Sequence, residues 1–528
     1  MTTTTFSDIS IYCPPLQEPR VKCKMEKPII GKCSDQHWFA ILISFLLCFI
    51  FLCFDYSAFL GPNNGVASLV NKQANSLVIM KNKTKNLVSQ NPSRDNTKEM
   101  KSNSDSCSGR YIYIHNLPSR FNYDLLKNCL SLTRGTDSNM CKYMVNLGLG
   151  PEIKDPDGVL SNKSWFSTNQ FLLEVIFHNR MKKYECLTND SSLASAIFVP
   201  FYAGLDVSLV LWNSNIKVRD SSGLDLVQWL VKKPQWKKMW GRDHFLVAGR
   251  ISWDFRRQFG NESYWGSNFR FLPESYNMSM LSVESSAWKN DFAIPYPTNF
   301  HPSKDTEIYQ WQSKIRGKTR KHLFTFAGAP RPELENSIRA KVIDQCRASS
   351  ACKFIDCSSS GGNNCENPVN ILRVFQSSVF CLQPPGDSYT RRSIFDSILS
   401  GCIPVFFHPG TAYSQYQWFL PKNRTKYSVY IPVRNVKEWD VNVEKVLLGI
   451  SKEEESAMRE EVIRLIPKII YSDPRSKLES SEDAFDIAVK SVLERVEKVR
   501  NVIREGGDPS VGFADPDHYK YTFSDNYS

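Results

Sequence analysis

The hydrophobic pattern of this chain changes character twice. An uncharged apolar run, "WFAILISFLLCFIFLCF", occupies residues 38–54. No sustained period follows until about residue 107, where short apolar segments of strand type begin to alternate with longer segments of helical spacing. Alternation of this kind is typical of βαβ units around a largely parallel sheet. The pattern therefore predicts an α/β protein whose folded part begins near residue 107.

The first series of elements runs to about residue 315. The segments "RYIYIHNLP", "ASAIFVPFY" and "DHFLVAG" have the apolar character of strands, whereas "WFSTNQFLLEVIFHNRM" and "LDLVQWLVKK" have helical spacing. In order along the chain, these predicted elements are strand 110–118, helix 165–181, strand 194–202, helix 224–233 and strand 243–249. They predict one α/β domain.

A second series of the same kind starts near residue 320. Its predicted elements are strand 321–328, helix 332–346, helix 367–378, strand 379–384, helix 389–401 and strand 402–407. Asn367 is the predicted N-cap of helix 367–378, with Pro368 in its first turn. Gly401 is predicted to end helix 389–401. Ser451 and Glu454 form a capping box before a further helix. A final stripe of apolar residues from 485 to 503 predicts a last core helix that is available to cross back to the first domain.

The apolar run at residues 38–54 has the composition of a membrane span. Seventeen uncharged residues lie at the short end of what crosses a bilayer, and "SAFLG" extends the run to about residue 60. Five basic residues occur in residues 20–32, whereas Lys72 is the first after the run. By the positive-inside rule the chain is a single-pass type II membrane protein with a lumenal C-terminal part. A cleaved signal peptide is the alternative, but its apolar core lies nearer the start.

These patterns predict six segments. Residues 61–106 are rich in Asn, Ser and Lys, which indicates a flexible stem. We therefore assign residues 1–37 to a cytoplasmic tail, 38–60 to a transmembrane signal anchor, 61–106 to the stem, 107–315 to an N-terminal lobe, 316–505 to a C-terminal lobe with closing helices, and 506–528 to a tail.

A lumenal location predicts sites for N-glycosylation and disulfide formation. Seven N-x-S/T acceptors lie after the anchor and none before it: Asn82, Asn162, Asn189, Asn261, Asn277, Asn423 and Asn526. Ten of the 15 cysteines also lie there. Four are clustered without the spacing of a structural zinc site, which favours disulfides: Cys346, Cys352, Cys357 and Cys365. Cys381 and Cys402 fall in apolar runs and are predicted to be ordinary core residues.

The net charge of +12 suits an anionic ligand but is also what a solvated basic surface gives. A lumenal compartment excludes nucleic acid. Charge does stand out in one place, because Asp387, Arg391, Arg392 and Asp396 interrupt the apolar segment 380–410.

That interruption follows a predicted strand and opens a predicted helix. The turn "PGDS", with Ser388, leaves the carboxyl end of the strand, where ligands bind in open α/β sheets. Arg391 and Arg392 fall in the first helical turn, where the helix dipole disfavours cations unless an external anion such as a pyrophosphate is bound. Asp396 lies one turn further, where it either accepts hydrogen bonds from ribose hydroxyls or pairs with Arg392. Both interpretations remain open on the pattern alone.

The segment "GDSYTRRSIFDSILSGCIPVFF" resembles the donor-binding segment of the exostosin-like inverting glycosyltransferases. Its residues are most similar to those of the plant xyloglucan galactosyltransferase branch. Further matching segments, in chain order, are "YIYIHNLPSRFN", "FLLEVIFHNRM", "ASAIFVPFYAGLD", "GRDHFLVAGRISWDFRR", "DFAIPYPTNFHP", "HLFTFAGAPRP" and "HPGTAYSQYQWFLP". The resemblance covers about residues 108–500.

The resemblance implies a GT-B fold with two Rossmann-like lobes, the C-terminal one holding a UDP-sugar. Asp396 would bind the ribose, and Arg391 or Arg392 the diphosphate; Ser393 stands where much of the wider family has the arginine. Ser388 would belong to the same donor site. Arg331, at the carboxyl end of strand 321–328, is either a further donor contact or a solvated loop residue.

The implied reaction is transfer of galactose, with inversion, from UDP-galactose to xylosyl side chains of xyloglucan in the Golgi. Galacturonic acid or arabinose donors, or a catalytically silent scaffold of a Golgi synthesis complex, are alternatives, and other Golgi glycosyltransferases are candidate partners. We expect no metal or other cofactor. The two "DPD" sequences, at Asp155/Asp157 and Asp515/Asp517, are typical of turns rather than of metal sites.

Inverting transfer requires a base that takes a proton from the acceptor hydroxyl. The first lobe offers three candidates in "GRDHFLVAGRISWDFRR". Asp243 and His244 open a predicted strand, and Asp254 lies beyond its carboxyl end, which favours Asp254 by position. Asp206, after the strand 194–202, is a further alternative.

Overall fold

The computed structural model describes residues 105–132, 139–155, 157–258, 265–286, 290–334, 337–358, 365 and 367–509. These residues belong to one compact unit. The predicted cytoplasmic tail, the predicted anchor and nearly all of the predicted stem lie outside the described residues. Within the described ranges, no helix has the length and apolar character needed to cross a membrane.

The first lobe is built on a five-stranded parallel sheet. Its strands are β1 (Tyr111–Ile114), β2 (Ala194–Phe198), β3 (His244–Ile251), β4 (Ser279–Glu284) and β5 (Asp291–Ala293), and they lie side by side in chain order. Every residue of β4 is buried, as is usual for a parallel strand covered on both faces. The prediction of an α/β fold with parallel sheets is confirmed for this part.

Helices surround this sheet: α3 (Tyr123–Lys127), α4 (Leu173–Met181), α5 (Ala203–Val210), α6 (Ile216–Val231), α7 (Pro234–Met239) and α8 (Pro273–Asn277). The predicted helix 165–181 is wrong in its first part, because α4 begins only at Leu173. Trp165 instead forms a β-bridge with Phe300 and packs on Trp311, with ring centroids 4.7 Å apart. Tertiary packing of an aromatic side chain has overridden the helical spacing here.

The second lobe holds another five-stranded parallel sheet. Its strands are β6 (His322–Gly328), β7 (Cys352–Asp356), β8 (Ser378–Gln383), β9 (Ile403–Phe406) and β10 (Val429–Tyr430). They lie in the order β10-β9-β8-β6-β7, so the direction of strand addition reverses between β6 and β8. A reversal of this kind separates the loops that leave the two strands at their carboxyl ends.

Nine helices of the described chain follow the first lobe: α9 (Asp305–Arg316), α10 (Arg339–Ala348), α11 (Pro368–Gln376), α12 (Ser393–Leu399), α13 (Val433–Lys437), α14 (Val443–Leu448), α15 (Lys452–Arg464), α16 (Ile466–Ile469) and α17 (Ala484–Arg504). The predicted caps are confirmed: the Asn367 side chain accepts from the backbone N–H of Val369, and Ser451 and Glu454 form a reciprocal capping box. Gly401 ends the segment after α12 with φ +61°, a conformation that favours glycine.

Single turns of 3₁₀ helix occupy residues 119–121, 129–132, 140–143, 146–148, 170–172, 252–255, 269–271, 409–411 and 424–426. Most of them connect the longer elements.

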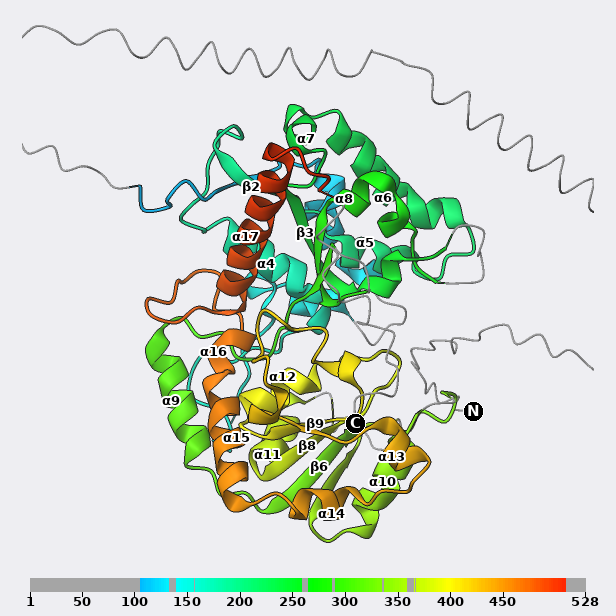
Figure 1. Ribbon diagram of the computed structural model, residues 1–528, viewed down its shortest axis with the longest axis vertical. Helices are drawn as coiled ribbons and strands as arrows, with labels where there is room; N and C mark the ends of the chain where they lie inside the picture. Colours follow the sequence, from blue (N-terminus) through cyan, green and yellow to red (C-terminus); the bar gives the residue numbers. More distant parts are fainter. Residues whose placement is uncertain are drawn as a thin grey trace, which may run out of the picture. The chain divides into compact units, whose positions relative to one another are not determined.

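The last helix returns to the first lobe, as predicted from its apolar stripe. Figure 1 shows α17 lying beside α4 and β2 rather than with the second sheet. Phe485 packs on Phe177 of α4, with ring centroids 4.7 Å apart, and Arg500 donates to the backbone carbonyl of Ser195 in β2 at 2.7 Å. The chain therefore crosses between the lobes once more at its C-terminal end.

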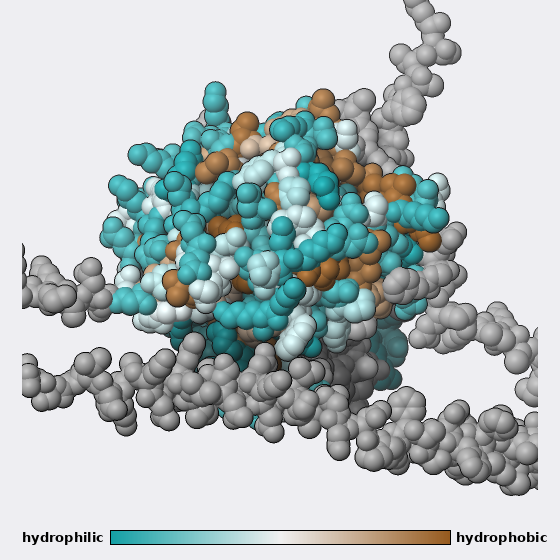
Figure 2. All heavy atoms as spheres, turned by 90° about the horizontal axis from the view of Figure 1, so that it is seen from above, coloured by the Kyte–Doolittle hydropathy of each residue, from teal (hydrophilic) through white to brown (hydrophobic). Residues whose placement is uncertain are grey.

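The surface of this end of the molecule is mostly hydrophilic. Figure 2 shows hydrophobic residues in small groups among hydrophilic ones. Hydrophobic side chains exposed on the first lobe include Trp240, which is 55% exposed, and Leu224, which is 44% exposed. Scattered exposure of this kind is normal for a folded domain and identifies no binding surface.

All ten cysteines after residue 60 are paired. The disulfides are Cys107–Cys186, Cys129–Cys141, Cys346–Cys352, Cys357–Cys365 and Cys381–Cys402. Disulfide pairing of the clustered cysteines is confirmed. Cys381 and Cys402 are buried core residues as predicted, but they are also bonded to each other: Cys381 lies in β8 and Cys402 directly precedes β9, with their Cα atoms 5.8 Å apart.

Removing the Cys381–Cys402 disulfide should destabilise the second lobe. The bond closes a loop with a sequence separation of 21, so the double substitution Cys381→Ala/Cys402→Ala should lower the free energy of unfolding by about 3 kcal/mol. Cys346→Ala/Cys352→Ala, with a separation of only 6, is the matched control and should cost less. Urea unfolding of both variants measures the difference, and a smaller loss at the longer loop would contradict the prediction.

Candidate active site

Two loops leave the second sheet at the point where its strand order reverses. The loop after β6 carries Arg331, and the loop after β8, residues 384–392, carries Gly386, Ser388 and Arg391. We call the latter the β8–α12 loop. Ligands of open α/β sheets bind outside the carboxyl ends of the strands at such a reversal. The topology therefore places the charged segment 387–396 at the position where a ligand is expected.

Two guanidinium groups converge on Gly386 in the β8–α12 loop. A Cβ atom at Gly386 would overlap Nη2 of Arg391 and lie 2.7 Å from Nη2 of Arg339. Arg339 is the first residue of α10, the helix that follows β6, and it donates to the carbonyls of Pro385 and Ala329 at 3.0 and 3.2 Å. The glycine thus permits a close approach of two cations that a side chain would block.

Arg331 completes a group of three arginines around this loop. It donates to Asp387 at 2.9 Å. Among the described residues, Arg339 and Arg391 have no carboxylate within the 4.0 Å of an ion pair; Arg391 donates to the hydroxyl of Ser388 and the carbonyl of Thr390. Burial, and then repulsion from Arg391 and Arg331, lowers the pKa of Arg339. Two closely placed cations without a carboxylate partner are suited to an external anion.

The two adjacent arginines of the sequence point to different partners. The prediction that both lie in the first turn of a helix is wrong, because α12 begins only at Ser393. Arg391 turns toward Gly386, whereas Arg392 reaches the first lobe, where it donates to the carbonyl of Thr168 at 2.7 Å and to the side chain of Asn299. Only Arg391 therefore belongs to the arginine group.

Asp396 lies in the first turn of α12 with its side chain 14% exposed. Its Oδ2 is 3.6 Å from Nε of Arg392, so the ion pair considered from the sequence is present. Its Oδ1 accepts no hydrogen bond from the described residues. Burial raises the pKa of Asp396, and Arg392 opposes that rise. One oxygen of this carboxylate thus remains available to a hydroxyl donor.

Ser388 fixes the shape of the β8–α12 loop. Its hydroxyl accepts from Nη1 of Arg391 at 3.2 Å, and its carbonyl accepts from the backbone N–H of Gly386 at 3.1 Å. These bonds close a small turn that holds Arg391 against Gly386. Ser388 is therefore a supporting residue of the arginine group in this structure.

The three base candidates occupy two places in the first lobe. Asp254 follows β3 and is buried, with Oδ2 accepting from Nη1 of Arg250 at 3.2 Å and Oδ1 accepting from Nε1 of Trp265 at 3.0 Å. Both of its oxygens are therefore engaged by other side chains. A carboxylate held in this way is a weaker base candidate than one with an unoccupied oxygen.

Asp243 and His244 form a separate buried chain of polar groups. Nδ1 of His244 is 2.7 Å from Asp243, and Nε2 of His244 is 3.1 Å from Nε2 of His115. Trp236 and Trp229 pack against these rings. Asp243 is 1% exposed and His244 is fully buried. The hydrogen bonds of this pair run to each other and to His115, not to the β8–α12 loop, so they lend no support to a catalytic role for either residue.

A carboxylate that the sequence analysis did not single out faces the β8–α12 loop. Glu284 ends β4 in the first lobe and is fully buried. Its Oε2 accepts from the backbone N–H of Thr390 at 2.8 Å and from the Thr390 hydroxyl at 2.6 Å. This contact joins the lobes directly beside Arg391.

Comparison with known proteins shows the family of the chain. A family model described as the exostosin GT47 domain matches residues 106–447. A protein named probable xyloglucan galactosyltransferase GT14, from Arabidopsis thaliana, is 57% identical over 520 residues, which cover 96% of this chain and 98% of that protein. The chain belongs to the exostosin GT47 family. The resemblance stated from the sequence is thereby confirmed, and the chain is a glycosyltransferase by family.

Other relatives of the chain differ in the sugar that their names give. The chain is 55% identical over 425 residues to xyloglucan galactosyltransferase MUR3 of Arabidopsis thaliana, covering 80% of this chain and 68% of that protein. It is 43% identical over 399 residues to xyloglucan-specific galacturonosyltransferase 1 of the same plant, covering 74% and 58%. The solved structure titled "Crystal Structure of TarM" is 11% identical and covers 61% of this chain and 57% of that one, with a TM-score of 0.29.

The predicted glycosylation acceptors of this GT47 member differ in accessibility. Asn162, Asn189 and Asn423 are exposed. Asn277 is half-buried and its amide donates to the carbonyl of Trp240 at 2.9 Å. Asn82, Asn261 and Asn526 lie outside the described residues.

Both aspartates of the first "DPD" sequence have partners elsewhere in the chain. Asp155 accepts from the backbone N–H of Leu160 at 2.6 Å, and Asp157 pairs with Arg373. The second "DPD", at Asp515/Asp517, lies outside the described residues. Within the described ranges, no group of three His, Cys, Asp or Glu residues is arranged to hold a metal ion.

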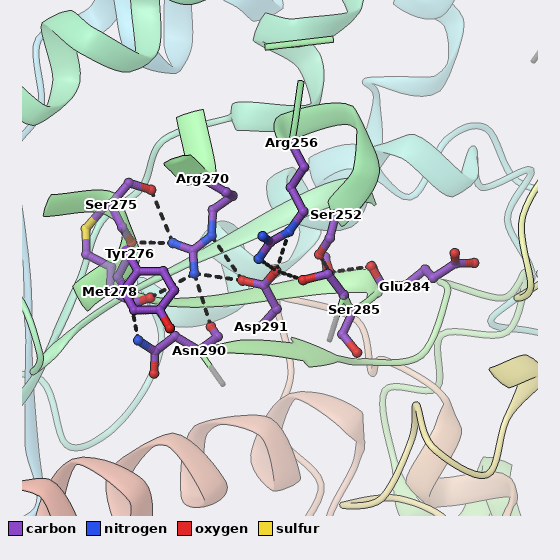
Figure 3. A network of polar contacts seen from close by, with 12 residues as sticks. Ser252, Arg256, Arg270, Ser275, Tyr276, Met278, Glu284, Ser285, Asn290 and Asp291 are labelled. Carbon is purple, nitrogen blue, oxygen red and sulfur yellow. Dashed lines mark hydrogen bonds and ion pairs between the residues drawn. The ribbon is translucent and has the colours of Figure 1, made fainter. Parts of the chain in front are cut away.

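A buried network supports the strand that carries Glu284. Figure 3 shows Asp291, at the start of β5, between the guanidinium groups of Arg256 and Arg270. Ser252 bonds to Ser282 of β4 at 3.0 Å, and the Ser282 hydroxyl donates to the carbonyl of Glu284 at 2.9 Å. The side chain of Glu284 extends away from this network in the figure. The network thus fixes the backbone while the carboxylate stays directed at the other lobe.

Two residues of the site, Arg339 and Glu284, were not identified from the sequence, for different reasons. Arg339 was read only as part of helix 332–346, although a cation opening a helix after a strand is the same signal that marked Arg391. Glu284 was missed because the strand "SMLSVE" was not predicted. The signal that could have found it is the carboxylate at the end of an apolar segment, "MLSVE".

Proposed function

We propose that the chain transfers galactose, with inversion, from UDP-galactose to xylosyl side chains of xyloglucan. The observation that carries this proposal is the group of arginines at the reversal point of the second sheet, in a member of the GT47 family. The names of the relatives at 55–57% identity supply the sugar and the acceptor. The acceptor is taken to lie on the side of the first lobe.

In this proposal the two lobes form a GT-B enzyme and the donor lies against the second lobe. Arg391 and Arg339, with Arg331 beside them, neutralise the diphosphate, and Asp396 accepts hydrogen bonds from the ribose through Oδ1. As UDP leaves, its growing negative charge falls on the same arginines. The enzyme then needs no metal ion or other cofactor for leaving-group stabilisation.

A neutral donor sugar suits the site better than an acidic one. UDP-galacturonic acid carries a carboxylate at C6, and Glu284 already places a buried carboxylate beside the β8–α12 loop. Two carboxylates in one water-poor site repel strongly. This repulsion is a second reason, beside the names of the relatives at 55–57% identity, to prefer galactose, even though one relative is named a galacturonosyltransferase.

We further propose that the enzyme is a single-pass type II protein of the Golgi membrane with a lumenal, N-glycosylated catalytic part. Five disulfides use all ten cysteines after residue 60, which suits an oxidising compartment. The exposed acceptors Asn162, Asn189 and Asn423 are compatible with glycosylation. The basic residues before the apolar run 38–54 give the orientation.

Incubation of the full-length chain with a panel of UDP-sugars and xyloglucan oligosaccharides tests the reaction. UDP-galactose should be the best donor, with UDP-galacturonic acid and UDP-arabinose at least about tenfold slower, since a mismatch of about 1.4 kcal/mol gives that factor. Absence of transfer from every UDP-sugar would overturn the proposal in favour of a silent scaffold. A faster reaction with UDP-galacturonic acid would overturn the choice of donor.

Asp396→Asn tests the ribose contact in the same assay. The substitution should weaken UDP binding about 10–100-fold, because hydrogen bonds to a charged group contribute about 1.5–3 kcal/mol. The acceptor KM should stay unchanged. Asp440→Asn, at an exposed position of the second lobe, is the matched control and should bind UDP normally. Unchanged UDP affinity in Asp396→Asn would remove Asp396 from the donor site.

A further inference from the structure

Glu284 occupies the position at which a first-lobe residue meets the donor loop. It is the last residue of β4, so its side chain lies at the carboxyl end of the first sheet. The loop it contacts is the β8–α12 loop, which carries Arg391 and lies at the reversal point of the second sheet. If the diphosphate lies against Arg391, the sugar attached to it extends toward the first lobe and Glu284.

The two oxygens of Glu284 are in different situations. Oε2 accepts both hydrogen bonds from Thr390, which fixes the orientation of the carboxylate. Oε1 is buried and accepts no hydrogen bond from the described residues. A buried carboxylate oxygen without a donor is costly unless another group occupies it at some stage. An oriented base with one unoccupied oxygen has the features required to receive a proton.

From this geometry we infer that Glu284 is the general base of the transfer, an inference that rests on the proposed function. Oε1 takes the proton of the acceptor hydroxyl while the hydroxyl oxygen of the acceptor attacks the anomeric carbon of the donor. The bond from the anomeric carbon to the diphosphate oxygen breaks, and its electron pair leaves with UDP beside Arg391 and Arg339. The proton stays on Glu284 until it passes to solvent, so the carboxylate is regenerated when the product leaves.

The surroundings of Glu284 suit this role. Burial raises its pKa, while the hydrogen bonds from Thr390 and the charge of Arg391 lower it by less. A raised pKa makes the carboxylate a stronger base than an exposed glutamate. The other titratable groups that face it are Tyr296, Tyr389 and Tyr416, and burial raises the pKa of each phenol. They remain neutral at the pH of any transfer assay.

The rival carboxylate in the first lobe lacks an unoccupied oxygen. Asp254 is engaged by Arg250 at one oxygen and by Trp265 at the other. A charged partner at the carboxylate also reduces its tendency to accept a proton. Glu284 has no ion pair within 4.0 Å among the described residues and directly contacts the donor loop.

The decisive variant is Glu284→Gln in the full-length chain. The amide oxygen can still accept both bonds from Thr390, so the lobes keep their contact while the basic oxygen is lost. With UDP-galactose and a xyloglucan oligosaccharide, kcat should fall about 10²–10⁴-fold. The affinity for UDP, measured by calorimetry, should stay within about threefold, because the diphosphate contacts are unaffected. A variant with kcat within threefold of the wild type would overturn the inference.

Two further measurements separate catalysis from structure. The wild-type kcat should fall as the pH drops through the pKa of Glu284, at a pH above the ordinary glutamate value of 4.5, and this limb should be absent in Glu284→Gln. Thr390→Val removes the hydroxyl contacts to Glu284 and Tyr296 but keeps the backbone bond to Glu284, so it should lower kcat by less than about tenfold. A wild-type profile without an acidic limb would overturn the inference even if Glu284→Gln did not fold.

The outcomes distinguish this inference from the proposed function. If the wild type transfers galactose and Glu284→Gln does so equally well, only the base is wrong. If Asp254→Asn loses more activity than Glu284→Gln, the base is Asp254. If the wild type transfers no sugar from any UDP donor, the proposed function falls, and the base with it.

Discussion

Replacing Asp291 by Asn is expected to lower the free energy of unfolding by about 3–5 kcal/mol, because it leaves two buried cations without a counter-charge. Asp291 is fully buried, and so is Arg270, while Arg256 is 6% exposed. Nε and Nη2 of Arg270 donate to Oδ1 of Asp291 at 3.0 and 2.7 Å. Nε and Nη2 of Arg256 donate to Oδ2 of Asp291. An amide at this position would turn one of these accepting oxygens into a donor that faces a guanidinium group.

The same network gives a defined dependence on pH. Burial acts to raise the pKa of Asp291, but Arg270, Arg256 and the Ser286 hydroxyl together outweigh it and lower the pKa to about 2. A group with a lowered pKa in the folded state stabilises the protein above its unfolded value of 3.8, and that contribution is lost as the pH falls from about 4 toward 2. Asp291→Asn should therefore lose its difference from the wild type in that acidic range.

Urea unfolding at neutral pH measures the effect, with an exposed ion pair as the control. Arg316 and Glu460 form the same kind of contact, with nitrogen–oxygen distances of 2.9 and 2.8 Å, but their side chains are 43% and 42% exposed. Glu460→Gln should cost no more than about 1 kcal/mol. An equal loss in the two variants would show that burial does not determine the contribution of the Asp291 network.

The strong local patterns of the sequence predicted part of the second lobe correctly, whereas β7, β10, α13 and α14 were not predicted and the helix predicted at 332–346 begins only at Arg339. β6, β8 and β9 coincide with three apolar runs, and α11 begins with the Asn367 cap because a side-chain oxygen and Pro368 define a helix start locally. Features that depend on distant contacts were not predicted. The backbone around Trp165 is not helical as predicted, because the Trp165 ring packs on Trp311, 146 positions away in the chain.

The same distinction explains the site. The position of the β8–α12 loop could be predicted, because charge at the end of an apolar strand is a local signal. The different directions of Arg391 and Arg392 could not, because the partners of Arg392 lie on the first lobe. Glu284 and Thr390 are 106 positions apart, and their contact exists only when the lobes meet. The Cys381–Cys402 pair was missed for a related reason, since strand order in the sheet brings the two together.

Replacing Arg391 by Met is expected to lower kcat/KM for the UDP-sugar about 10²–10³-fold, as is typical when one group that stabilises a developing negative charge is removed. The reason is its position. Its guanidinium group lies against Gly386 beside that of Arg339, and among the described residues it has only hydroxyl and carbonyl acceptors. A diphosphate supplies the negative charge that this part of the loop lacks, and a lysine would supply the charge without the forked geometry.

Comparison of UDP with uridine shows whether Arg391 acts on the phosphate. Arg391→Met should weaken UDP binding about 10–100-fold, because hydrogen bonds to charged groups contribute about 1.5–3 kcal/mol, and it should leave uridine binding unchanged. Arg434→Met is the control, since Arg434, on α13, has a half-exposed side chain and pairs with Glu438 just after the helix. If uridine and UDP weaken by the same factor, Arg391 shapes the loop rather than binding the diphosphate. If neither changes, the anion lies against Arg339 and Arg331 alone, and the arginine that the sequence placed next to α12 has only a structural role.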